Sequence, residues 1–304
     1  MLPTSCSILL TCVPRIEAPC DTSRPLPVAE SSSIGTLKVH ELIQPELLKM
    51  RLGHSLFSSH IYYQASIDST NAVAKALAGQ GAPEGALVIT EEQTAGRGRR
   101  GKSWVSPPGA NLLFSVLLRP AMEGDRVFVL TMVLALAGLK AVRRVTGVKA
   151  MIKWPNDLYV GTKKLSGILT EFSVREKQVD WAVPGMGINV GWHPDVPEGG
   201  GVPATSLLEE TGHRVSRNDL LFEILTGFEP LYREVVRGSM KALYKEWNQN
   251  CLVLGKAVVV ESERERIEGR ALRIDDCGAL IIEDAKGIQR RILTGDVSLR
   301  FGAS

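Results

Sequence analysis

The sequence lacks the features that mark several common protein classes. Its five cysteines are odd in number and include no C-x-x-C pair, so a reduced, cytoplasmic setting fits best. The five histidines are scattered without the spacing of metal ligands, which argues against a zinc site. No Ser-His-Asp or reactive-cysteine pattern indicates an enzyme nucleophile.

Charge and hydropathy exclude further classes. A net charge of +3 is close to neutral for 304 residues and gives no support for general nucleic-acid binding. The longest apolar run, Val127 to Val142, is shorter than a membrane span and contains Lys140, so we expect a buried core helix and no membrane partner. No basic residue precedes the mildly apolar Ser7 to Val13, which argues against a secretory signal.

Periodicity and turn residues predict alternating helices and strands up to residue 250. Expected strands are 60–65, 86–92, 111–118, 148–154, 158–160, 165–172 and 179–190. Expected helices are 41–52, 72–77, 125–145, 203–210, 217–237 and 239–249. After Cys251, short β-rich runs at 256–263, 267–274, 279–283, 288–293 and 297–301 favour a small barrel. The Pro- and Ser-rich segment 19–36 indicates a poorly ordered lead-in.

The most informative stretch is Gln93 to Trp104, in which the cations Arg97, Arg99, Arg100 and Lys102 alternate with glycines. Glycine lets backbone N–H groups approach an anion, and arginine binds phosphate or carboxylate through a planar fork. The stretch therefore predicts a loop that closes over a small anionic ligand.

Two other interpretations of this loop were weighed. Gly96 to Gly101 fits G-x-G-x-x-G, but the next strand ends at Arg119-Pro120 rather than at an acid, and no helix is expected at the third glycine. A dinucleotide site is therefore disfavoured. A basic surface loop is the plain alternative, although close like charges repel each other.

A second cluster is Lys153-Trp154-Pro155-Asn156-Asp157 followed by Lys163 to Leu169. Lysine is a point charge for phosphates or a developing carboxylate, and an aspartate can hold a cation or orient a nucleophile. Two basic loops and one acid suggest a nucleotide-using site that activates a carboxylate. A surface hairpin with solvated lysines is the alternative.

With these motifs the chain resembles the biotin protein ligases, also called biotin–[acetyl-CoA-carboxylase] ligases. The resemblance rests on five ordered motifs: Asp68 to Asn71, Gln93 to Trp104, Lys153 to Asp157, Lys164 to Ile168 and Gly185 to Asn189. It implies an α+β fold, with a mixed central sheet and packed helices akin to class II aminoacyl-tRNA synthetase cores, followed by a small SH3-like β barrel. The expected domains are a partly disordered extension 1–58, a catalytic domain 59–250 and a β domain 251–304.

The resemblance also implies a two-step reaction. The biotin carboxylate attacks the α-phosphate of ATP, with Mg²⁺, and gives biotinyl-5′-AMP and pyrophosphate. A lysine of a biotin carboxyl carrier protein or domain then forms an amide and releases AMP. Both steps build negative charge near the α-phosphate, where fixed cations stabilise the transition state. A closing loop excludes water from the hydrolysable intermediate.

Residue roles follow from the same resemblance. The biotin-binding set is Ser69, Thr70, Asn71, Gln93, Gly96, Arg97, Trp104 and Lys164, with Arg97 on the carboxylate and Trp104 over the ligand. The nucleotide-binding set is Arg99, Lys102 and Asn189. The catalytic set is Arg99, Lys164 and Asp157, where Asp157 binds magnesium or orients the attacking lysine. Lys153 is expected to give structural support, and Ser69 or Thr70 could serve simply as a helix cap.

The sequence also departs from the family pattern. Lys102 stands where the family usually has arginine, and Ser103 stands where a basic residue is common. The first 58 residues lack a helix-turn-helix pattern with basic residues, so we expect no DNA partner and no repressor function. A homodimer is left open.

Three other functions are alternatives to a biotin ligase. A lipoate or octanoyl ligase shares the fold, but Lys153 to Asp157 favours biotin. A DNA-binding regulator needs a DNA-binding head. A non-catalytic ligand sensor predicts loss of Arg97, Arg99 or Lys164, and all three are present.

Overall fold

The computed structural model describes residues 42–195, 202–261, 265–293 and 295–299. Most of the expected N-terminal extension 1–58, including the apolar stretch 7–13 and the lead-in 19–36, therefore lies outside the described residues, as do the ends of the predicted runs at 263 and 301.

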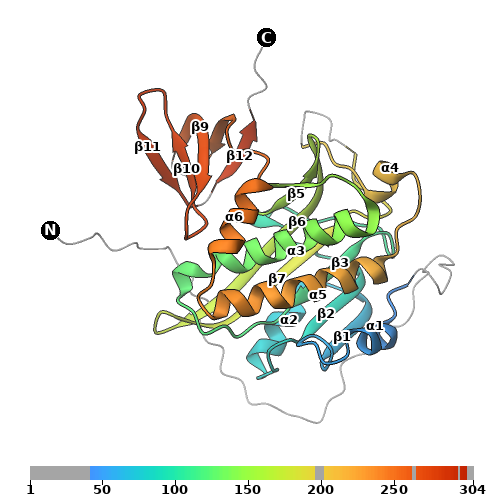
Figure 1. The fold of residues 1–304 in the computed structure, drawn as a ribbon. Helices are drawn as coiled ribbons and strands as arrows, with labels where there is room; N and C mark the ends of the chain where they lie inside the picture. Colours follow the sequence, from blue (N-terminus) through green and yellow to red (C-terminus); the bar gives the residue numbers. More distant parts are fainter. Residues whose placement is uncertain (1–41, 196–201, 262–264, 294, 300–304) are drawn as a thin grey trace. The chain divides into compact units, whose positions relative to one another are not determined.

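A seven-stranded mixed sheet forms the centre of the structure, in the order β1-β2-β3-β7-β6-β5-β4 (Figure 1). Its strands are β1 Ile61–Ile67, β2 Leu87–Gln93, β3 Leu112–Val116, β4 Met151–Lys153, β5 Asp157–Val160, β6 Lys163–Arg175 and β7 Gln178–Ile188. Strands β1 and β2 pair in parallel, and every other neighbouring pair in this sheet is antiparallel. The predicted mixed central sheet is confirmed.

Helices lie on both faces of this sheet, as strand alternation requires. They are α1 Pro45–Leu52, α2 Thr70–Gly79, α3 Phe128–Thr146, α4 Leu207–Thr211, α5 Arg217–Val236 and α6 Lys241–Gln249. Figure 1 shows α3 and α5 across one face, where Leu87, Ile89 and Met186 belong to the main core. The alternate residues Val88 and Val183 pack with Ala74 of α2 on the opposite face.

The predicted core helix is confirmed by α3, whose residues from Val129 to Leu139 are all buried. Among the described residues, no helix is both long and apolar enough to cross a membrane.

The predicted start of the helix at 203–210 is wrong, because the observed helix α4 begins only at Leu207. Ala204 instead forms a parallel bridge with Lys164, and α4 starts after Ser206, whose hydroxyl accepts a hydrogen bond from the Glu209 amide at 3.2 Å. Ser206 and Glu209 have the spacing of a capping box, which marks the true helix start. The residues before it are therefore available to pair with β6.

A second sheet follows α6 and contains β8 Ala257–Glu261, β9 Arg266–Ile274, β10 Leu280–Glu283, β11 Gln289–Ile292 and β12 Asp296–Leu299. All of its pairs are antiparallel, in the order β11-β10-β9-β8-β12. The predicted small β domain is confirmed. Its predicted closure into a barrel is not, because no pairing joins β11 to β12 within the described residues.

A buried ion pair ties distant segments together. Glu91 Oε2 accepts from Arg217 Nη1 at 2.5 Å, and their side chains are only 2% and 5% exposed. The other Glu91 oxygen accepts from the Ile43 amide at 2.8 Å and from the Tyr63 hydroxyl at 3.0 Å. One carboxylate thus joins β1, β2, the start of α5 and the segment before α1.

We expect Arg217→Met to lower the free energy of unfolding by about 3–5 kcal/mol, because it leaves the Glu91 carboxylate buried without its cation. Urea denaturation measures this loss. Arg233→Met is the matched control: Arg233 pairs with Glu229 at 2.6 Å but is 54% exposed, so its loss should cost less than about 1 kcal/mol. Equal losses in the two variants would contradict the assigned weight of the buried pair.

Candidate functional site

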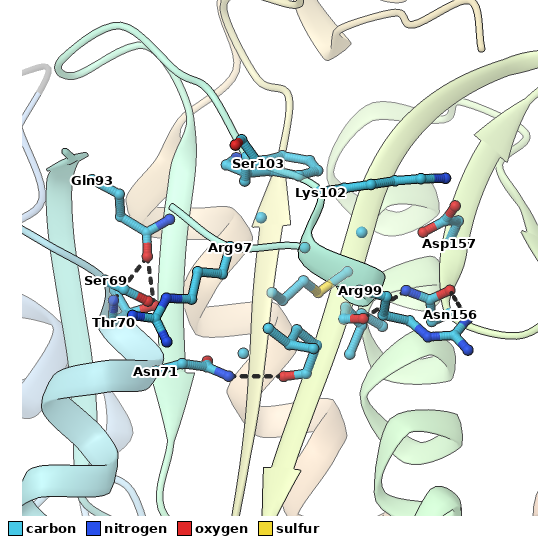
Figure 2. A pocket seen from close by; sticks show the side chains of 18 of the residues that line it. Ser69, Thr70, Asn71, Gln93, Arg97, Arg99, Lys102, Ser103, Asn156 and Asp157 are labelled. Carbon is cyan, nitrogen blue, oxygen red and sulfur yellow. Dashed lines mark hydrogen bonds between the residues drawn. The ribbon is translucent and has the colours of Figure 1, made fainter. Parts of the chain in front are cut away.

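A cavity of about 150 Å³ opens on the α2 face of the central sheet. Figure 2 shows two groups of polar side chains around it: Ser69, Thr70, Asn71, Gln93 and Arg97 at one end, and Arg99, Lys102, Asn156 and Asp157 at the other. The remaining lining residues are Gly98, Ser103, Trp104, Lys164, Gly167, Ile168, Leu169, Gly185, Met186 and Gly187. Sequence positions as far apart as Ser69 and Gly187 therefore meet at one cavity.

The N-terminus of α2 forms the first end. Ser69 occupies the N-cap position in an extended conformation, but its side chain makes no cap hydrogen bond. Instead Gln93 Oε1, at the end of β2, accepts from the Thr70 amide at 2.8 Å and lies 3.1 Å from the Thr70 hydroxyl. The simple capping role considered for Ser69 is therefore not seen, and Gln93 satisfies the Thr70 amide, one of the first-turn amides that have no partner within the helix.

Two glycines opposite each other form a flat floor for Trp104. Gly167 of β6 and Gly187 of β7 are register partners. A Cβ on Gly187 would lie 2.5 Å from Trp104 Cε2, and one on Gly167 would lie 3.1 Å from Cζ3. The indole therefore rests directly on the backbone of both strands, which only residues without side chains allow.

The basic loop folds back on itself. Arg97 bridges Ser103, the Gly98 amide donates to Lys102 O at 2.6 Å, and the Trp104 amide donates to Gly96 O at 2.9 Å. A short 3-10 turn, Arg99–Gly101, forms the tip. Arg97, Arg99 and Lys102 of the loop line the cavity, whereas Arg100 lies outside the lining and donates to Glu261 O at 3.3 Å.

This fold excludes two phosphate-loop geometries. Gly96 to Ser103 fits the P-loop spacing G-x-x-x-x-G-K-[ST], a match that sequence reasoning overlooked. A P-loop or a dinucleotide loop leads directly into a helix. Here Lys102 is extended, and the chain forms no helix between Gly101 and β3. The disfavoured dinucleotide geometry is absent from these described residues.

The second end carries charge. Lys164 Nζ lies 2.9 Å from Asp157 Oδ1, an ion-pair contact that does not also meet hydrogen-bond geometry. Arg99 Nη1 donates to Asn156 Oδ1 at 3.0 Å, and Asn156 Nδ2 donates to Ile168 O at 2.7 Å. Asn156, which was given no role from sequence, therefore orients Arg99 at the cavity.

A β-bulge aims Lys164. Leu158 pairs with Ser166 but Tyr159 pairs with Lys164, so Leu165 is the extra residue. In a regular strand, Lys164 and Gly167 would face opposite sides. The bulge instead brings Lys164 Nζ within 3.3 Å of a Cβ built on Gly167. Pro203 O and the Thr205 amide hold the Lys164 backbone at 2.7 and 2.9 Å.

Three predicted residues lie elsewhere. Asn189 is buried outside the lining, and its Nδ2 donates to Thr205 O at 3.0 Å. Gly96 lines a neighbouring hollow beside Glu171, where a Cβ would lie 2.3 Å from Trp104 O. Lys153 donates to the Tyr159 hydroxyl at 3.1 Å and does not line the cavity, which accords with a supporting place.

Sequence reasoning missed polar residues beneath the first end. Ser115 Oγ lies 2.6 Å from Asn71 Oδ1, and Asn71 Nδ2 donates to Glu171 Oε2 at 2.9 Å. A Cβ on Gly185 would lie 2.0 Å from Asn71 Oδ1, so Gly185 makes room for this pair. The signal was weak: one serine within the apolar run Leu112 to Leu118, and one acid within β6.

The acidic groups give limited support for a metal. Asp157 is the one carboxylate among the residues that line the cavity. In the described part of the chain, the one group of three or more clustered ligating side chains is Asp275, Asp276 and Cys277, which excludes Asp157. Because Mg²⁺ is commonly held by one or two carboxylates together with substrate phosphates, Asp157 fits such a site only as a single ligand.

We expect Gly187→Ala to loosen the basic loop, because the new Cβ meets the indole of Trp104. Overpacking of this kind costs about 1–3 kcal/mol, which corresponds to a rise of about 5- to 150-fold in loop opening. Trypsin cleavage after the cations of Arg97 to Lys102 measures the opening. Gly227→Ala is the control, because its Cβ would lie 4.0 Å from the nearest neighbour, Ala137 Cβ. Unchanged cleavage in Gly187→Ala would show that Trp104 does not hold the loop.

Comparison with known proteins places this arrangement in a family. Residues 63–189 match the Biotin/lipoate A/B protein ligase family, and residues 253–300 match the Biotin protein ligase C terminal domain. The chain is 34% identical over 229 residues to the Biotin--[acetyl-CoA-carboxylase] ligase of Paracoccus denitrificans, covering 74% of this chain and 95% of that protein. It is 34% identical over 253 residues to the Bifunctional ligase/repressor BirA of Bacillus spizizenii, covering 83% of this chain and 78% of that one.

A solved structure agrees with these matches. The biotin protein ligase from Aquifex aeolicus in complex with biotin and ATP has a TM-score of 0.67 and 30% identity, covering 80% of this chain and 99% of the other. The matches span both the central sheet with its cavity and the small β domain. The chain therefore belongs to the biotin protein ligase family.

Proposed function

We propose that this ligase activates biotin with ATP in the cavity on the α2 face and transfers it to a lysine of a biotin carrier domain. One observation carries the proposal: hydroxyl and amide groups of Ser69, Thr70, Asn71 and Gln93 gather at one end of the cavity, which we call the neutral end although Arg97 borders it, and the cations Arg99, Lys102 and Lys164 lie at the other. Biotin has the same division, with an uncharged cyclic urea at one end and a carboxylate at the other. The match to the C-terminal domain of biotin protein ligases supports biotin over lipoate.

The neutral end binds the ureido ring. Ser69, Thr70 and Gln93 offer hydroxyl and amide groups, and Trp104 covers the bicycle as an apolar wall. Arg97 borders this end, and Figure 2 shows its guanidinium beside Thr70. We assign it to the biotin carboxylate.

The cationic end carries out the adenylation. A biotin carboxylate oxygen forms a bond to the α-phosphorus as the bond to pyrophosphate breaks, and negative charge builds on the phosphoryl oxygens. Lys164, Arg99 and Lys102 line this end of the cavity, and we assign these three cations to the phosphoryl oxygens. Such fixed charges act on the transition state more than on the substrates. Asp157 would hold Mg²⁺ together with the phosphates, and the ion would neutralise part of the triphosphate charge.

The transfer step uses the same residues. The carrier lysine must arrive as a neutral amine, attack the carbonyl of the mixed anhydride and expel AMP. Asp157, 2.9 Å from Lys164, is placed to orient the incoming amine and take its proton. Lys164 then stabilises the oxyanion and the leaving phosphate. Asn189, with its amide bound to Thr205, supports the nucleotide side from behind the cavity.

The wider assignment follows the same reasoning. We divide the chain at 1–58, 59–250 and 251–304, with catalysis in the second part, and assign neither DNA binding nor a repressor role. Cys251 and Cys277 carry free thiols, and burial raises the pKa of Cys251 to about 11. These thiols are compatible with a reducing, cytoplasmic compartment.

Transfer of labelled biotin to a purified biotin carboxyl carrier domain tests the function, with and without ATP and Mg²⁺. Labelling that requires ATP is the expected result. Lipoate as the competing acid tests the sister activity, and preferential transfer of lipoate would overturn the biotin assignment. Tight binding of biotin without any transfer would overturn the ligase assignment in favour of a sensor.

We expect Lys164→Met to lower kcat for this transfer by about 10²–10³-fold, because it removes a cation from the developing negative charge. The neighbouring Lys163→Met is the matched control. Lys163 lies outside the cavity lining and pairs with Glu209 at 2.5 Å, so its loss should change kcat by less than about twofold, as expected for a surface ion pair. An equal loss in both variants would indicate a general charge effect and remove the specific role of Lys164.

A further inference from the structure

A chain of polar contacts runs beneath the neutral end of the cavity, away from the reacting atoms. Lys75 Nζ lies 2.5 Å from Glu171 Oε1, and Glu171 Oε2 accepts from Asn71 Nδ2 at 2.9 Å. Asn71 Oδ1 lies 2.6 Å from Ser115 Oγ, which lies 2.7 Å from Thr70 Oγ1. The chain thus joins a surface ion pair to the hydroxyl that faces the ligand.

The Glu171 end fixes the direction of this chain. An ionised carboxylate and a backbone carbonyl can only accept hydrogen bonds. Asn71 Nδ2 faces both kinds, at Glu171 Oε2 and at Leu169 O, 3.2 Å away. The amide of Asn71 is therefore oriented by chemistry, with its oxygen toward Ser115. That oxygen needs a donor, so the Ser115 hydroxyl gives its proton to Asn71.

The next hydroxyl is constrained in turn. With the Ser115 proton committed, the 2.7 Å contact between Ser115 and Thr70 needs the Thr70 proton. The other place for that proton is Gln93 Oε1, 3.1 Å away, which already accepts the Thr70 amide at 2.8 Å. In both cases the proton stays inside the protein. Thr70 therefore presents only lone pairs to the cavity, which suits the N–H groups of a cyclic urea.

We propose that Glu171 is a specificity-determining residue that sets this hydrogen-bond polarity and so selects a ligand that donates N–H to Thr70. The inference rests on the proposed function, because it takes the urea ring of biotin as that ligand. Glu171 acts through Asn71 and Ser115 and is a positioning residue, since it does not line the main cavity. Gly185 is part of the same arrangement, because the absence of a side chain there leaves space for Asn71 and Ser115.

Glu171→Gln tests the polarity without changing shape. Lys75 holds the oxygen of the new amide, which turns the amide NH₂ toward Asn71. Asn71 must then rotate and donate to Ser115, so the Ser115 proton turns to Thr70 and occupies one of its lone pairs. Thr70 then has one acceptor site fewer for the urea N–H, and its own proton is left to Gln93 or to the cavity. We therefore expect the Kd for biotin, measured by calorimetry on the full chain, to rise about ten- to a hundred-fold. The Kd for ATP should not change.

Lys75→Met distinguishes polarity from simple loss of charge. Alone, it leaves the Glu171 carboxylate as an acceptor, so the Kd for biotin should stay within about threefold of wild type. In Lys75→Met combined with Glu171→Gln, the glutamine can turn its oxygen to Asn71, and binding should return to within about threefold of wild type. A merely structural role for the ion pair predicts no such rescue.

Glu246→Gln is the matched control. Glu246 forms another surface ion pair, 2.8 Å from Lys140, and takes no part in the polar contacts that run from Lys75 to Thr70. Its Kd for biotin and melting temperature should match those of wild type. Wild-type affinity in Glu171→Gln, or a double variant as weak as Glu171→Gln, overturns the proposal while the ligase function stands. Failure of the wild-type chain to bind biotin overturns the proposed function itself.

Discussion

The site depends on one constraint: two positions of β7 carry no side chain on the face that α2 covers. Gly185 leaves room for Asn71 and Ser115, and Gly187, opposite Gly167, leaves room for the indole of Trp104. A methyl group at either position of β7 would lie within 2.5 Å of a neighbour. The strand therefore supplies two surfaces at once, a polar relay at one glycine and a flat platform at the other. Met186, between them, points to the main core instead.

This arrangement separates the two chemical tasks along a single cavity. The helix end at Thr70 and the strand end at Gln93 provide neutral groups, whose hydrogen-bonding directions are fixed by their neighbours. The bulge at Leu165 provides charge, because it moves Lys164 onto the face where Gly167 leaves space. A ligand that spans the cavity thus meets hydrogen bonds at one end and cations at the other. Its reacting group is positioned by contacts made several bonds away, as binding energy from the unreactive part of a substrate can do.

Much of the fold was predictable, because it depends on patterns of burial. Strand alternation and the apolar run of α3 located the mixed sheet and its main helix. Motif positions such as Thr70, Arg99 and Lys164 were predicted as a group for a different reason, since the ordered motifs resemble those of the biotin protein ligases. The start of α4 was mispredicted because Ser206 was not recognised as a cap. Barrel closure was expected from strand spacing alone, which carries no information on whether the edge strands meet.

Other parts of the site could not be predicted, because they depend on tertiary contacts that leave no local trace. A serine in an apolar strand, such as Ser115, looks like a tolerated polar residue until Asn71 is seen beside it. Glu171 looks like a solvated strand residue until its second oxygen is found on Asn71. Asn189 is the reverse case, since its place in a glycine-rich motif suggests a ligand contact, yet its amide binds Thr205. In each case the decisive fact is the direction of a hydrogen bond, which residue spacing does not encode.

The two ion pairs on this sheet, Glu91 with Arg217 and Glu171 with Lys75, have different effects. Glu91 and Arg217 are both almost fully buried, so the ion pair must stay intact for its charges to be tolerated, and its value lies in joining segments. Lys75 and Glu171 are each 28% exposed, so water screens them and their attraction adds little to folding. What Glu171 supplies is a carboxylate, a group that only accepts hydrogen bonds. A weak ion pair can therefore matter for recognition, because it fixes the orientation of an amide and two hydroxyl protons that the ligand meets.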